Sequence, residues 1–413
     1  ITFQAPLAPE KRNATFDAVE REVKCSQKSY VSAKNCLILN IFKPNTNETN
    51  NPVVVYIHGG TFSSGYGNYL KPITLAANGI VGVTVNYRLG PLGFLCLNTE
   101  SVPGNAGLKD LIAALRWVRD NIANFGGDNK NVTIAGYSAG AALTEQLMLS
   151  KASNGLFNKV ILESGSGNAF WALDRDPIKT AQNYGKLIGI PKVDNVNILS
   201  EYYTNQTEKH LYSMFLFKGQ PYFMPCIEVS PNKSEWIISE DPVDTLKSNN
   251  YTKLPIMLGY TNAEGLLYFD NTVSFMREMN RNFTEFLPND QRLRAQIVDA
   301  NKVKEYYFKN QLIDLSMFST FIRYLTDVFF SYPIVSSARY HAKDNNHVYL
   351  YEFSYVDSLN VFGLKDIGAD HTAQTSHVLD NDIYLVNNNF FNKEDMNMRN
   401  NITALWINFI KHG

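Results

Sequence analysis

Residues 131–150 read NVTIAGYSAGAALTEQLMLS and place Ser138 between an apolar run typical of a strand and one typical of a helix. Gly136 and Gly140 stand two residues before and two residues after this serine. In the pattern G-x-S-x-G the serine occupies a sharp, strained strand-to-helix turn that leaves room only for small neighbours. We therefore interpret Ser138 as a nucleophile rather than a plain turn residue. The following helix would aim the Ala139 N–H at the space where an oxyanion forms.

Runs typical of strands and helices alternate on both sides of this turn. Residues 105–127 repeat apolar side chains with the period of an amphipathic helix, which we expect Asn105 to cap and Gly126 and Gly127 to end. Short apolar or β-branched runs predict further strands at 52–60, 79–88, 159–164, 254–260 and 347–355. This alternation favours a mostly parallel sheet covered by helices on both faces, in one α/β domain over residues 1–413.

The composition allows a large packed core and excludes several classes of partner. The chain has 413 residues, of which 45% are hydrophobic and 13% aromatic. Lys and Arg number 38 against 39 Asp and Glu, with no basic stripe, which argues against a nucleic-acid partner. No apolar run is long enough to predict a membrane span. The chain begins at Ile1 inside an extended phrase, so we expect a mature form that is trimmed at both ends.

Cysteines and glycosylation sequons favour a secreted protein. Cys25 and Cys36 flank a short polar stretch, which suits a small disulfide loop in an oxidising compartment. Cys96 and Cys226 lie in apolar phrases, where we expect two free buried thiols, with a second disulfide as the alternative. We expect no glycan on Asn131, which opens a core strand. Sequons in polar, loop-like stretches predict glycans on Asn13, Asn47, Asn205, Asn232, Asn250 and Asn282.

A serine nucleophile needs a base, and the base needs an orienting acid. With a G-x-S-x-G turn these groups follow along the chain in the order serine, acid, histidine. Glu264 comes shortly after the strand predicted at 254–260 and precedes Gly265. His371 lies in the loop DIGADHTAQ, beyond the last strong strand. Loop glutamates and histidines are more often simply solvated, so both residues are candidates on this argument alone.

Taken together, these phrases resemble the type-B carboxylesterase and cholinesterase family of α/β-hydrolases. The similarity extends over nearly the whole chain, through KCSQ, NCLILNIFKP, VVVYIHGGTFSSG, VNYRLGPLGFL, PGNAGLKDLIAALRWVRDNIANFGGD, VTIAGYSAGA, LFNKVILESGS and ALWINFIKHG. The resemblance implies an α/β-hydrolase fold and a serine carboxylesterase without cofactor or metal. The GYSAGA phrase and the sequons are most similar to secreted insect carboxylesterases.

The resemblance also implies roles for particular residues. Ser138 matches the nucleophile, Glu264 the acid in G-x-x-x-x-E-G, and His371 the base in G-x-x-H. Ser164 matches a serine that supports the acid and base, and Phe62 and Trp171 are expected to line the substrate pocket. The oxyanion hole would use three backbone N–H groups, those of Gly60, Thr61 and Ala139.

The pocket itself is expected to be apolar. The phrases FFSYPIVSSARYHA (329–342) and FLFKGQPYFMP (215–225) are rich in aromatic side chains. They suggest a gorge suited to small or medium neutral esters as the small-molecule partner. The acyl and alcohol groups of that ester, and the oligomeric state, are not predicted.

Three features depart from the family pattern. Thr61 replaces the usual third glycine of the oxyanion loop, and we expect it to narrow the pocket while the loop keeps its shape. Asn35 replaces the acidic residue before the second cysteine, which removes a structural ion pair. The loop between Cys25 and Cys36 contains no Trp, which argues against choline esters because that side chain cradles choline in cholinesterases.

Other functions are weaker interpretations of the same sequence. A catalytically silent, adhesion-type relative is the main alternative, although such relatives typically lose a triad member and all three positions are filled here. A lipase would need an apolar lid helix, and none stands out. A metal site built on Asp370, His371 and His377 has suitable ligand types but no familiar spacing.

Overall fold

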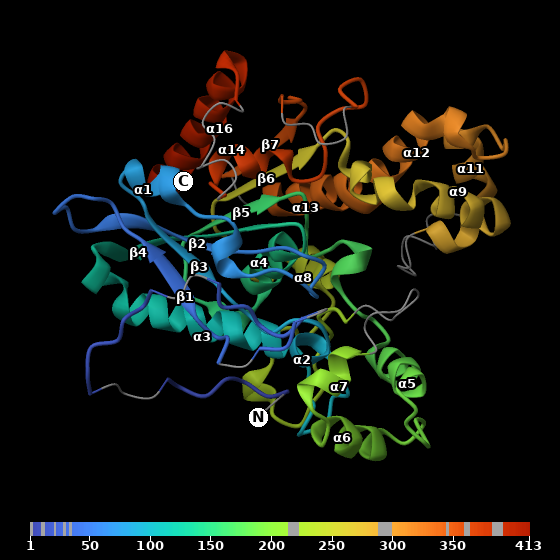
Figure 1. The fold of residues 1–413 in the computed structure, drawn as a ribbon, viewed down its shortest axis with the longest axis horizontal. Coiled ribbons are helices and arrows are strands. Elements are labelled where there is room, and N and C mark those ends of the chain that lie inside the picture. The colour runs from blue at the N-terminus through green and yellow to red at the C-terminus, as the bar shows by residue number, and fades with distance from the viewer. Residues whose placement is uncertain are drawn as a thin grey trace.

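A central sheet of seven strands organises the computed structural model (Figure 1). The structure describes residues 3–9, 13–19, 22–27, 30–32, 35–213, 223–287, 300–343, 347–358, 364–381 and 391–413. The strand order is β1-β3-β2-β4-β5-β6-β7; β1 runs antiparallel to β3, and every other pair is parallel. The strands are Leu39–Phe42 (β1), Asn51–Ile57 (β2), Val81–Val85 (β3), Gly127–Tyr137 (β4), Lys159–Glu163 (β5), Ile256–Thr261 (β6) and Val348–Phe353 (β7).

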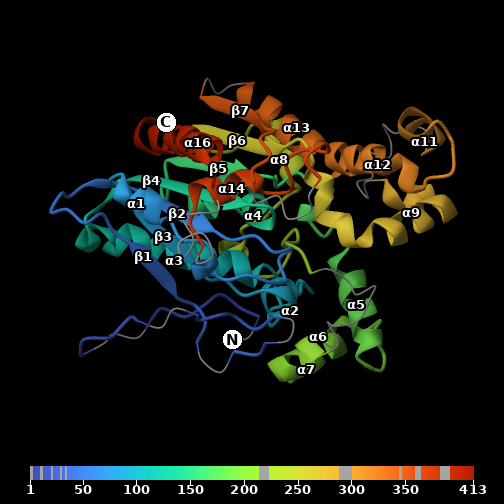
Figure 2. The ribbon, with the colours of Figure 1, turned by 45° about the horizontal axis from the view of Figure 1, so that its top comes forward.

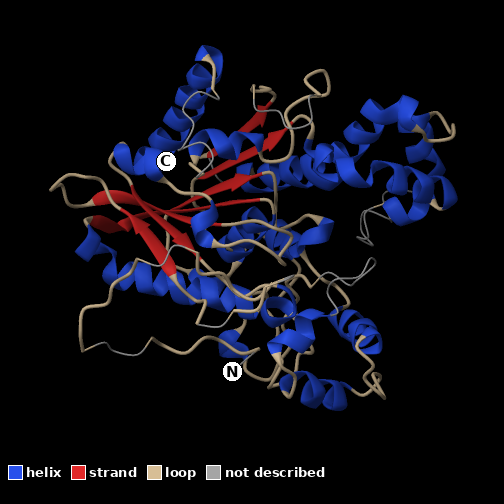
Figure 3. Ribbon diagram, viewed as in Figure 1, coloured by secondary structure: helices blue, strands red, loops and turns tan. Residues whose placement is uncertain are grey.

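Helices cover both faces of this sheet, as Figure 3 shows. Helices α1, α14 and α16 lie on one face, and α3, α4 and α13 lie on the other. The described helices are Ile73–Ala77 (α1), Gly90–Phe94 (α2), Ala106–Asn121 (α3), Ala139–Leu149 (α4), Pro177–Leu187 (α5), Val196–Thr204 (α6), Glu208–Ser213 (α7), Pro242–Ser248 (α8), Thr272–Arg281 (α9), Ala300–Phe308 (α11), Phe318–Leu325 (α12), Tyr332–Ala342 (α13), Ala373–Val378 (α14) and Lys393–His412 (α16).

Strand β2 shows why the sheet is buried on both sides. Val53, Val55 and Ile57 belong to the core beneath α3 and α4. Val54 and Tyr56 belong to the core beneath α1 and α16. Successive side chains of a strand point to opposite faces, so an uninterrupted apolar run supplies both cores at once. The run predicted at 52–60 becomes this strand, which ends at Ile57.

A third core lies outside the sheet. Helices α9, α11 and α12 pack around Phe283, Phe308 and Tyr324. Figures 1 and 2 show this group at the right of the molecule, beyond α13. These elements are the helical insertions of the fold.

The disulfide prediction for the second cysteine pair is wrong. Cys96 and Cys226, predicted as free thiols, form a disulfide across a sequence separation of 130. They meet beside Gly104, where a Cβ atom would lie 2.6 Å from each sulfur. The pairing depends on two distant loops coming together, which local apolar character does not reveal.

Helix α3 matches its prediction in place but not in capping. Asn105 precedes it with φ 55° and makes no side-chain cap. Its amide instead donates to the Cys226 carbonyl at 2.8 Å and accepts the Cys226 N–H at 2.9 Å. Gly126, with φ 81°, ends the 3-10 turn after the helix, whereas Gly127 begins β4 rather than ending the helix.

Candidate active site

Ser138 lies on the sharp turn that the G-x-S-x-G pattern predicts. It joins β4 to α4 with φ 53° and ψ −125°, a strained conformation for a residue with a side chain. A Cβ atom at Gly136 would lie 2.5 Å from the backbone carbonyl of Gly140. A Cβ atom at Gly140 would lie 2.2 Å from the Ile57 oxygen. The turn can therefore close only with glycine at both positions.

The backbone of Ser138 is held from both neighbouring elements. Its N–H donates to the Glu163 carbonyl of β5 at 2.8 Å, and its carbonyl accepts the Ala142 N–H at 3.1 Å. A Cβ atom at Gly165 would lie 2.3 Å from the Ser138 oxygen. Ser138 is 8% exposed, so it is almost buried but still reachable.

His371 and Glu264 are brought together, although they lie far apart in the sequence. The imidazole Nδ1 of His371 is bonded to Oε2 of Glu264. Glu264 is fully buried at the carboxyl end of β6, and its Oε1 accepts the Thr261 N–H at 2.8 Å. A buried carboxylate that holds one imidazole nitrogen orients the other nitrogen for proton transfer.

Hydrogen bonds between two loops hold His371 next to Glu264. The Asn262 amide oxygen accepts the Ala369 N–H at 2.8 Å, and the Ala263 N–H donates to the Ala369 carbonyl at 3.0 Å. Gly368, with φ 134°, lies so close that a Cβ atom would be 2.5 Å from Asn262. The glycine of the G-x-x-H phrase thus lets the loop of the histidine pack on the loop of the acid.

The second imidazole nitrogen is available for chemistry. Nε2 of His371 is buried and has no hydrogen-bond partner among the residues that the structure describes. The structure therefore contains the acid–base pair without a hydrogen bond from Ser138 to His371. Hydrogen bonds of this kind are often long before a substrate binds and shorten in the complex.

The predicted oxyanion loop follows β2 and passes beside the serine. A Cβ atom at Gly59 would lie 3.0 Å from Ser138 Cβ. The following residues, Gly60, Thr61 and Phe62, have φ values of 104°, 52° and 58°. Three consecutive positive φ angles make a left-handed turn, which is rare for residues with side chains. Ala139, the third predicted donor, is the first residue of α4 and is fully buried.

His58, which opens this loop, is structural rather than catalytic. Burial lowers its pKa to about 4, so the ring is neutral at neutral pH. Its ring stacks on Tyr87 at 4.4 Å, and its Nδ1 lies 2.8 Å from the Gly59 oxygen. His58 therefore packs against the oxyanion loop and supports it.

The two predicted pocket residues lie in a line of rings that ends at the histidine. The ring centroids of Phe62 and Trp171 are 6.4 Å apart, and those of Trp171 and Phe330 are 5.7 Å apart. Phe330 then lies 4.8 Å from the His371 ring. Phe330 comes from the phrase 329–342 that the sequence marked as aromatic. Residues 215–222 of the other marked phrase lie outside the described residues.

A proline places Trp171 in this line. Between α12 and α13 the chain forms a π-helical segment, Thr326–Ser331, just before Pro333. Proline has no N–H, so the Phe329 carbonyl, four residues earlier, loses its helical partner. The indole N–H of Trp171 donates to that carbonyl at 2.7 Å. The interrupted helix thus provides the acceptor that holds the Trp171 side chain.

Helix α14, just after His371, joins the site to the end of β5. The Gln374 amide donates to Ser164 Oγ at 3.0 Å, so Ser164 supports the segment of the base rather than contacting the base directly. Thr375 donates to a Glu163 carboxyl oxygen at 2.7 Å. Burial raises the Glu163 pKa to about 8, with a further contribution from the negative charge of Glu264.

Sequence reasoning did not mark Glu163 or Gln374 as part of the site. An acidic residue at the end of the apolar run KVILE was the available signal for Glu163, because buried carboxyl groups are rare. Nothing in the sequence around Gln374 indicated that its amide would reach Ser164.

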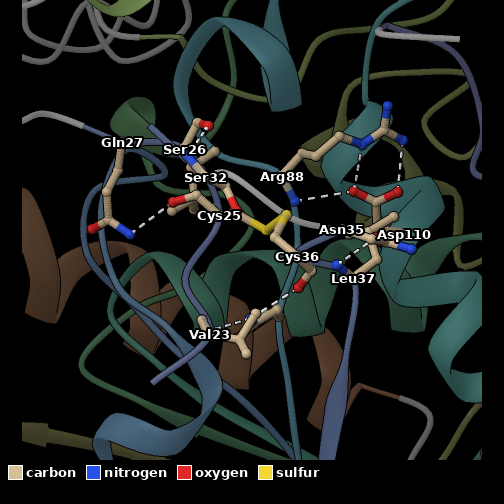
Figure 4. Close-up of a disulfide and its surroundings, with 12 residues drawn as sticks. Val23, Cys25, Ser26, Gln27, Ser32, Asn35, Cys36, Leu37, Arg88 and Asp110 are labelled. Carbon is tan, nitrogen blue, oxygen red and sulfur yellow. Dashed lines mark hydrogen bonds and ion pairs between the residues drawn. A yellow bond between two sulfur atoms is a disulfide. The ribbon is translucent and has the colours of Figure 1, made fainter. Parts of the chain in front are cut away.

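The first disulfide, Cys25–Cys36, is present and lies beside the Arg88–Asp110 pair (Figure 4). Nε and one terminal nitrogen of Arg88 donate to the two oxygens of Asp110 at 2.7 and 2.6 Å. Asn35, the departure next to Cys36, makes no ion pair, and its side chain accepts the Leu37 N–H at 3.0 Å.

The alternative metal site, on Asp370, His371 and His377, does not form in the structure. His377 is buried, and its Nε2 lies 3.3 Å from an Asp357 oxygen. His371 is bonded to Glu264 instead. Across the ranges that the structure describes, no group of three or more His, Cys, Asp or Glu side chains is arranged to hold a metal ion.

Comparisons with known proteins identify the family and the fold. A model described as the carboxylesterase family matches residues 1–413. Esterase FE4 of Myzus persicae is 30% identical over 420 residues, which cover 93% of this chain and 71% of that protein. The solved structure of juvenile hormone esterase from Manduca sexta, with OTFP covalently attached, has a TM-score of 0.86 to this chain at 29% sequence identity. The match covers 100% of this chain and 83% of that structure. Neuroligin-3 of Mus musculus is 29% identical over 88% of this chain and 45% of its own length.

The sheet, its two helical layers and the serine at a strand-to-helix turn define an α/β-hydrolase. The chain belongs to the carboxylesterase family and is a carboxylic ester hydrolase.

Proposed function

We propose that the chain hydrolyses neutral carboxylic esters through a Ser138–His371–Glu264 triad. His371 Nε2 takes the Ser138 proton as the serine oxygen attacks the ester carbonyl. The Glu264 carboxylate stabilises the imidazolium that forms. Backbone N–H groups of Gly60, Thr61 and Ala139 stabilise the tetrahedral oxyanion. The imidazolium then protonates the leaving alkoxide, and water activated by the same base hydrolyses the acyl-enzyme to release the acid.

The observation that supports this proposal is the combination of a bonded acid–base pair, in which the acid is fully buried, with an unpartnered Nε2 among the described residues. The His371–Glu264 bond joins two loops and places a half-buried imidazole on a fully buried carboxylate. The strained serine turn lies at the carboxyl ends of the same parallel strands, where α/β proteins gather their reacting groups.

Covalent labelling and substitution of Ser138 test the proposal. An organophosphate should form one adduct on Ser138, and Ser138→Ala should lower turnover of 4-nitrophenyl acetate by roughly 10⁴-fold or more without lowering the thermal midpoint. Ser248→Ala, at the exposed end of α8, is the matched control and should keep both labelling and turnover. An adduct on a different serine, or undiminished turnover in Ser138→Ala, would contradict the assignment.

A catalytically silent binding protein is the second candidate. It is favoured by the similarity to neuroligin-3, a relative that is not named as an esterase. Folded protein that neither turns over esters nor reacts with the organophosphate would support this candidate. The filled triad positions favour the enzyme.

We also propose that the protein is secreted and glycosylated. Both disulfides suit an oxidising compartment, and none of the described helices is both long and apolar enough to cross a membrane. Asn131 is half-buried and its side chain is bonded to Lys159, which argues against a glycan there. Mass mapping of protein from a secretory host would test six sites, all exposed: Asn13, Asn47, Asn205, Asn232, Asn250 and Asn282.

A further inference from the structure

The carbonyl oxygen of Gly60 is surrounded by hydrogen-bond donors. The N–H groups of Ser63 and Ser64 lie 3.0 and 2.9 Å from it. The hydroxyl of Thr61 lies 2.8 Å away, that of Ser64 3.1 Å and that of Ser63 3.4 Å. The Thr61 and Ser63 hydroxyls are themselves 2.8 Å apart. A carbonyl oxygen has two lone pairs, so these donors share it and together fix the direction in which it points.

That direction also fixes the next N–H. The carbonyl of Gly60 and the N–H of Thr61 belong to one planar trans peptide, so they point in opposite directions. Holding the Gly60 oxygen on the side of the serine hydroxyls therefore turns the Thr61 N–H to the other side. In the proposed mechanism that N–H is one of the oxyanion donors.

The rest of the loop is tied down without these hydroxyls. The Phe62 carbonyl accepts the Gly90 N–H at 2.7 Å. The Gln27 side chain pairs with both backbone groups of Gly65, each at 3.1 Å. The orientation of the Gly60–Thr61 peptide is thus the part of the loop that depends most on the hydroxyls.

The backbone strain at Thr61 favours a flip of this peptide. It is β-branched, and its φ of 52° lies in the left-handed region that such residues avoid. A flip of the Gly60–Thr61 peptide could relieve that strain but would remove the N–H from the oxyanion. The flip would also break every hydrogen bond to the Gly60 oxygen, including the one from Thr61 itself.

We propose that the Thr61 hydroxyl, with those of Ser63 and Ser64, is a positioning group that holds the Gly60–Thr61 peptide with its N–H facing the oxyanion. This inference rests on the proposed esterase mechanism. It explains how a threonine can occupy a position where the related family uses glycine. The side chain that causes the backbone strain also supplies a bond that opposes its release.

Substitutions of Thr61 that change either the side-chain shape or the hydroxyl test the proposal. Turnover of 4-nitrophenyl acetate by the full chain is measured for each variant. Thr61→Val keeps the β-branch and loses the hydroxyl, so kcat should fall by about tenfold or more while KM stays within about threefold. Complete loss of one oxyanion donor, roughly 10²–10³-fold, sets the upper limit of this effect. Thr61→Ser restores the hydroxyl and should recover most of that loss. Thr61→Gly relieves the strain, so its kcat should lie within about tenfold of the parent.

An oxyanion-specific readout distinguishes positioning from simple destabilisation. A trifluoromethyl ketone, which the serine attacks to form a tetrahedral adduct, should lose affinity in Thr61→Val in proportion to kcat/KM. Rates are expressed per active site by organophosphate titration, so a smaller folded fraction does not imitate the effect. Thr204→Val is the matched control, because this exposed threonine also donates to backbone carbonyls, at 2.9 and 3.0 Å, far from the site in sequence.

The outcomes are distinct. Equal kcat and equal ketone affinity in Thr61→Val, Thr61→Ser and the parent would overturn the proposal while leaving the esterase assignment intact. A parent protein without turnover or labelling would instead refute the proposed function. If Thr61→Val does not fold, the Ser63→Ala/Ser64→Ala variant replaces it: a loss of about threefold or more in kcat per site supports the proposal, and parental kcat overturns it.

Discussion

At the scale of single residues, the candidate triad divides into one locally determined group and two that depend on contacts. Ser138 is positioned by its own turn, whose glycines and strained φ are consequences of local sequence. His371 is placed by Glu264, and Glu264 by the Thr261 N–H. The base and acid should therefore respond differently to substitution.

We predict that Glu264→Gln costs less turnover than His371→Ala, although both are severe. The acid orients and stabilises the base, whereas the base moves the proton, so the first loss should be roughly 10²–10⁴-fold and the second larger. Steady-state kinetics with 4-nitrophenyl acetate, normalised to active sites, measures both. His377→Ala is the comparison variant, since His377 lies against Asp357. A loss in His377→Ala as large as that in His371→Ala would mean that the base is misassigned.

At the scale of elements, the helical stretch from α12 to α13 positions the rings of Trp171 and Phe330 because it is interrupted. Pro333 leaves the Phe329 carbonyl free for the Trp171 indole, and the π-helical segment carries Phe330 to the His371 ring. If these rings line the substrate pocket as proposed, changes in this helix should alter substrate preference.

We predict that Trp171→Phe and Pro333→Ala shift acyl preference in the same direction. The first removes the indole donor, and the second supplies an N–H that competes for the Phe329 carbonyl. Both release the ring at position 171, so the ratio of kcat/KM for butanoyl over acetyl esters should change by about tenfold, as expected for one to two methylene-sized contacts.

The control for this experiment is Pro242→Ala. Pro242 stands in the first turn of α8, where the missing N–H has no helical acceptor and the substitution should be neutral. A parental acyl ratio in both Trp171→Phe and Pro333→Ala would show that the indole bond does not shape the pocket.

At the scale of the whole molecule, the centre of the sheet contains a carboxyl group that has little access to water. Glu163 is fully buried at the end of β5, next to Glu264, and burial raises its pKa from 4.5 to about 8. Between these pH values the folded protein holds a proton that the unfolded chain has lost. The Glu163 contribution to the free energy of unfolding therefore decreases as pH rises through this range.

We predict that Glu163→Gln becomes more stable relative to the parent as pH rises. The difference in unfolding free energy between variant and parent should increase in favour of the variant from about pH 4.5 to about pH 8, by on the order of 3 kcal/mol. Urea denaturation at pH 5 and pH 8 measures it. Glu305→Gln, on the exposed surface of α11, is the matched control. A difference that does not change with pH would show that Glu163 is ionised in the folded protein throughout.

Local periodicity and local backbone strain could be predicted from the amino-acid sequence. The alternation of strand-like and helical runs predicted a sheet covered on both faces, and the helical period of 105–127 predicted α3. Gly136 and Gly140 predicted the turn of Ser138, because only glycine allows that close backbone approach. The base and acid, by contrast, were ordinary loop residues until a family resemblance selected them.

Contacts between distant groups could not be predicted in this way, because they arise only when the chain is folded. The Cys96–Cys226 disulfide, the Asn105 bonds to Cys226 and the His371–Glu264 bond each join loops that are far apart in the sequence. Such contacts depend on the order of the strands in the sheet, and local composition does not predict that order. The role of Thr61 is of the same kind. Its sequence position indicated backbone strain, whereas the hydrogen bond that opposes the strain exists only once the loop turns back on the Gly60 carbonyl.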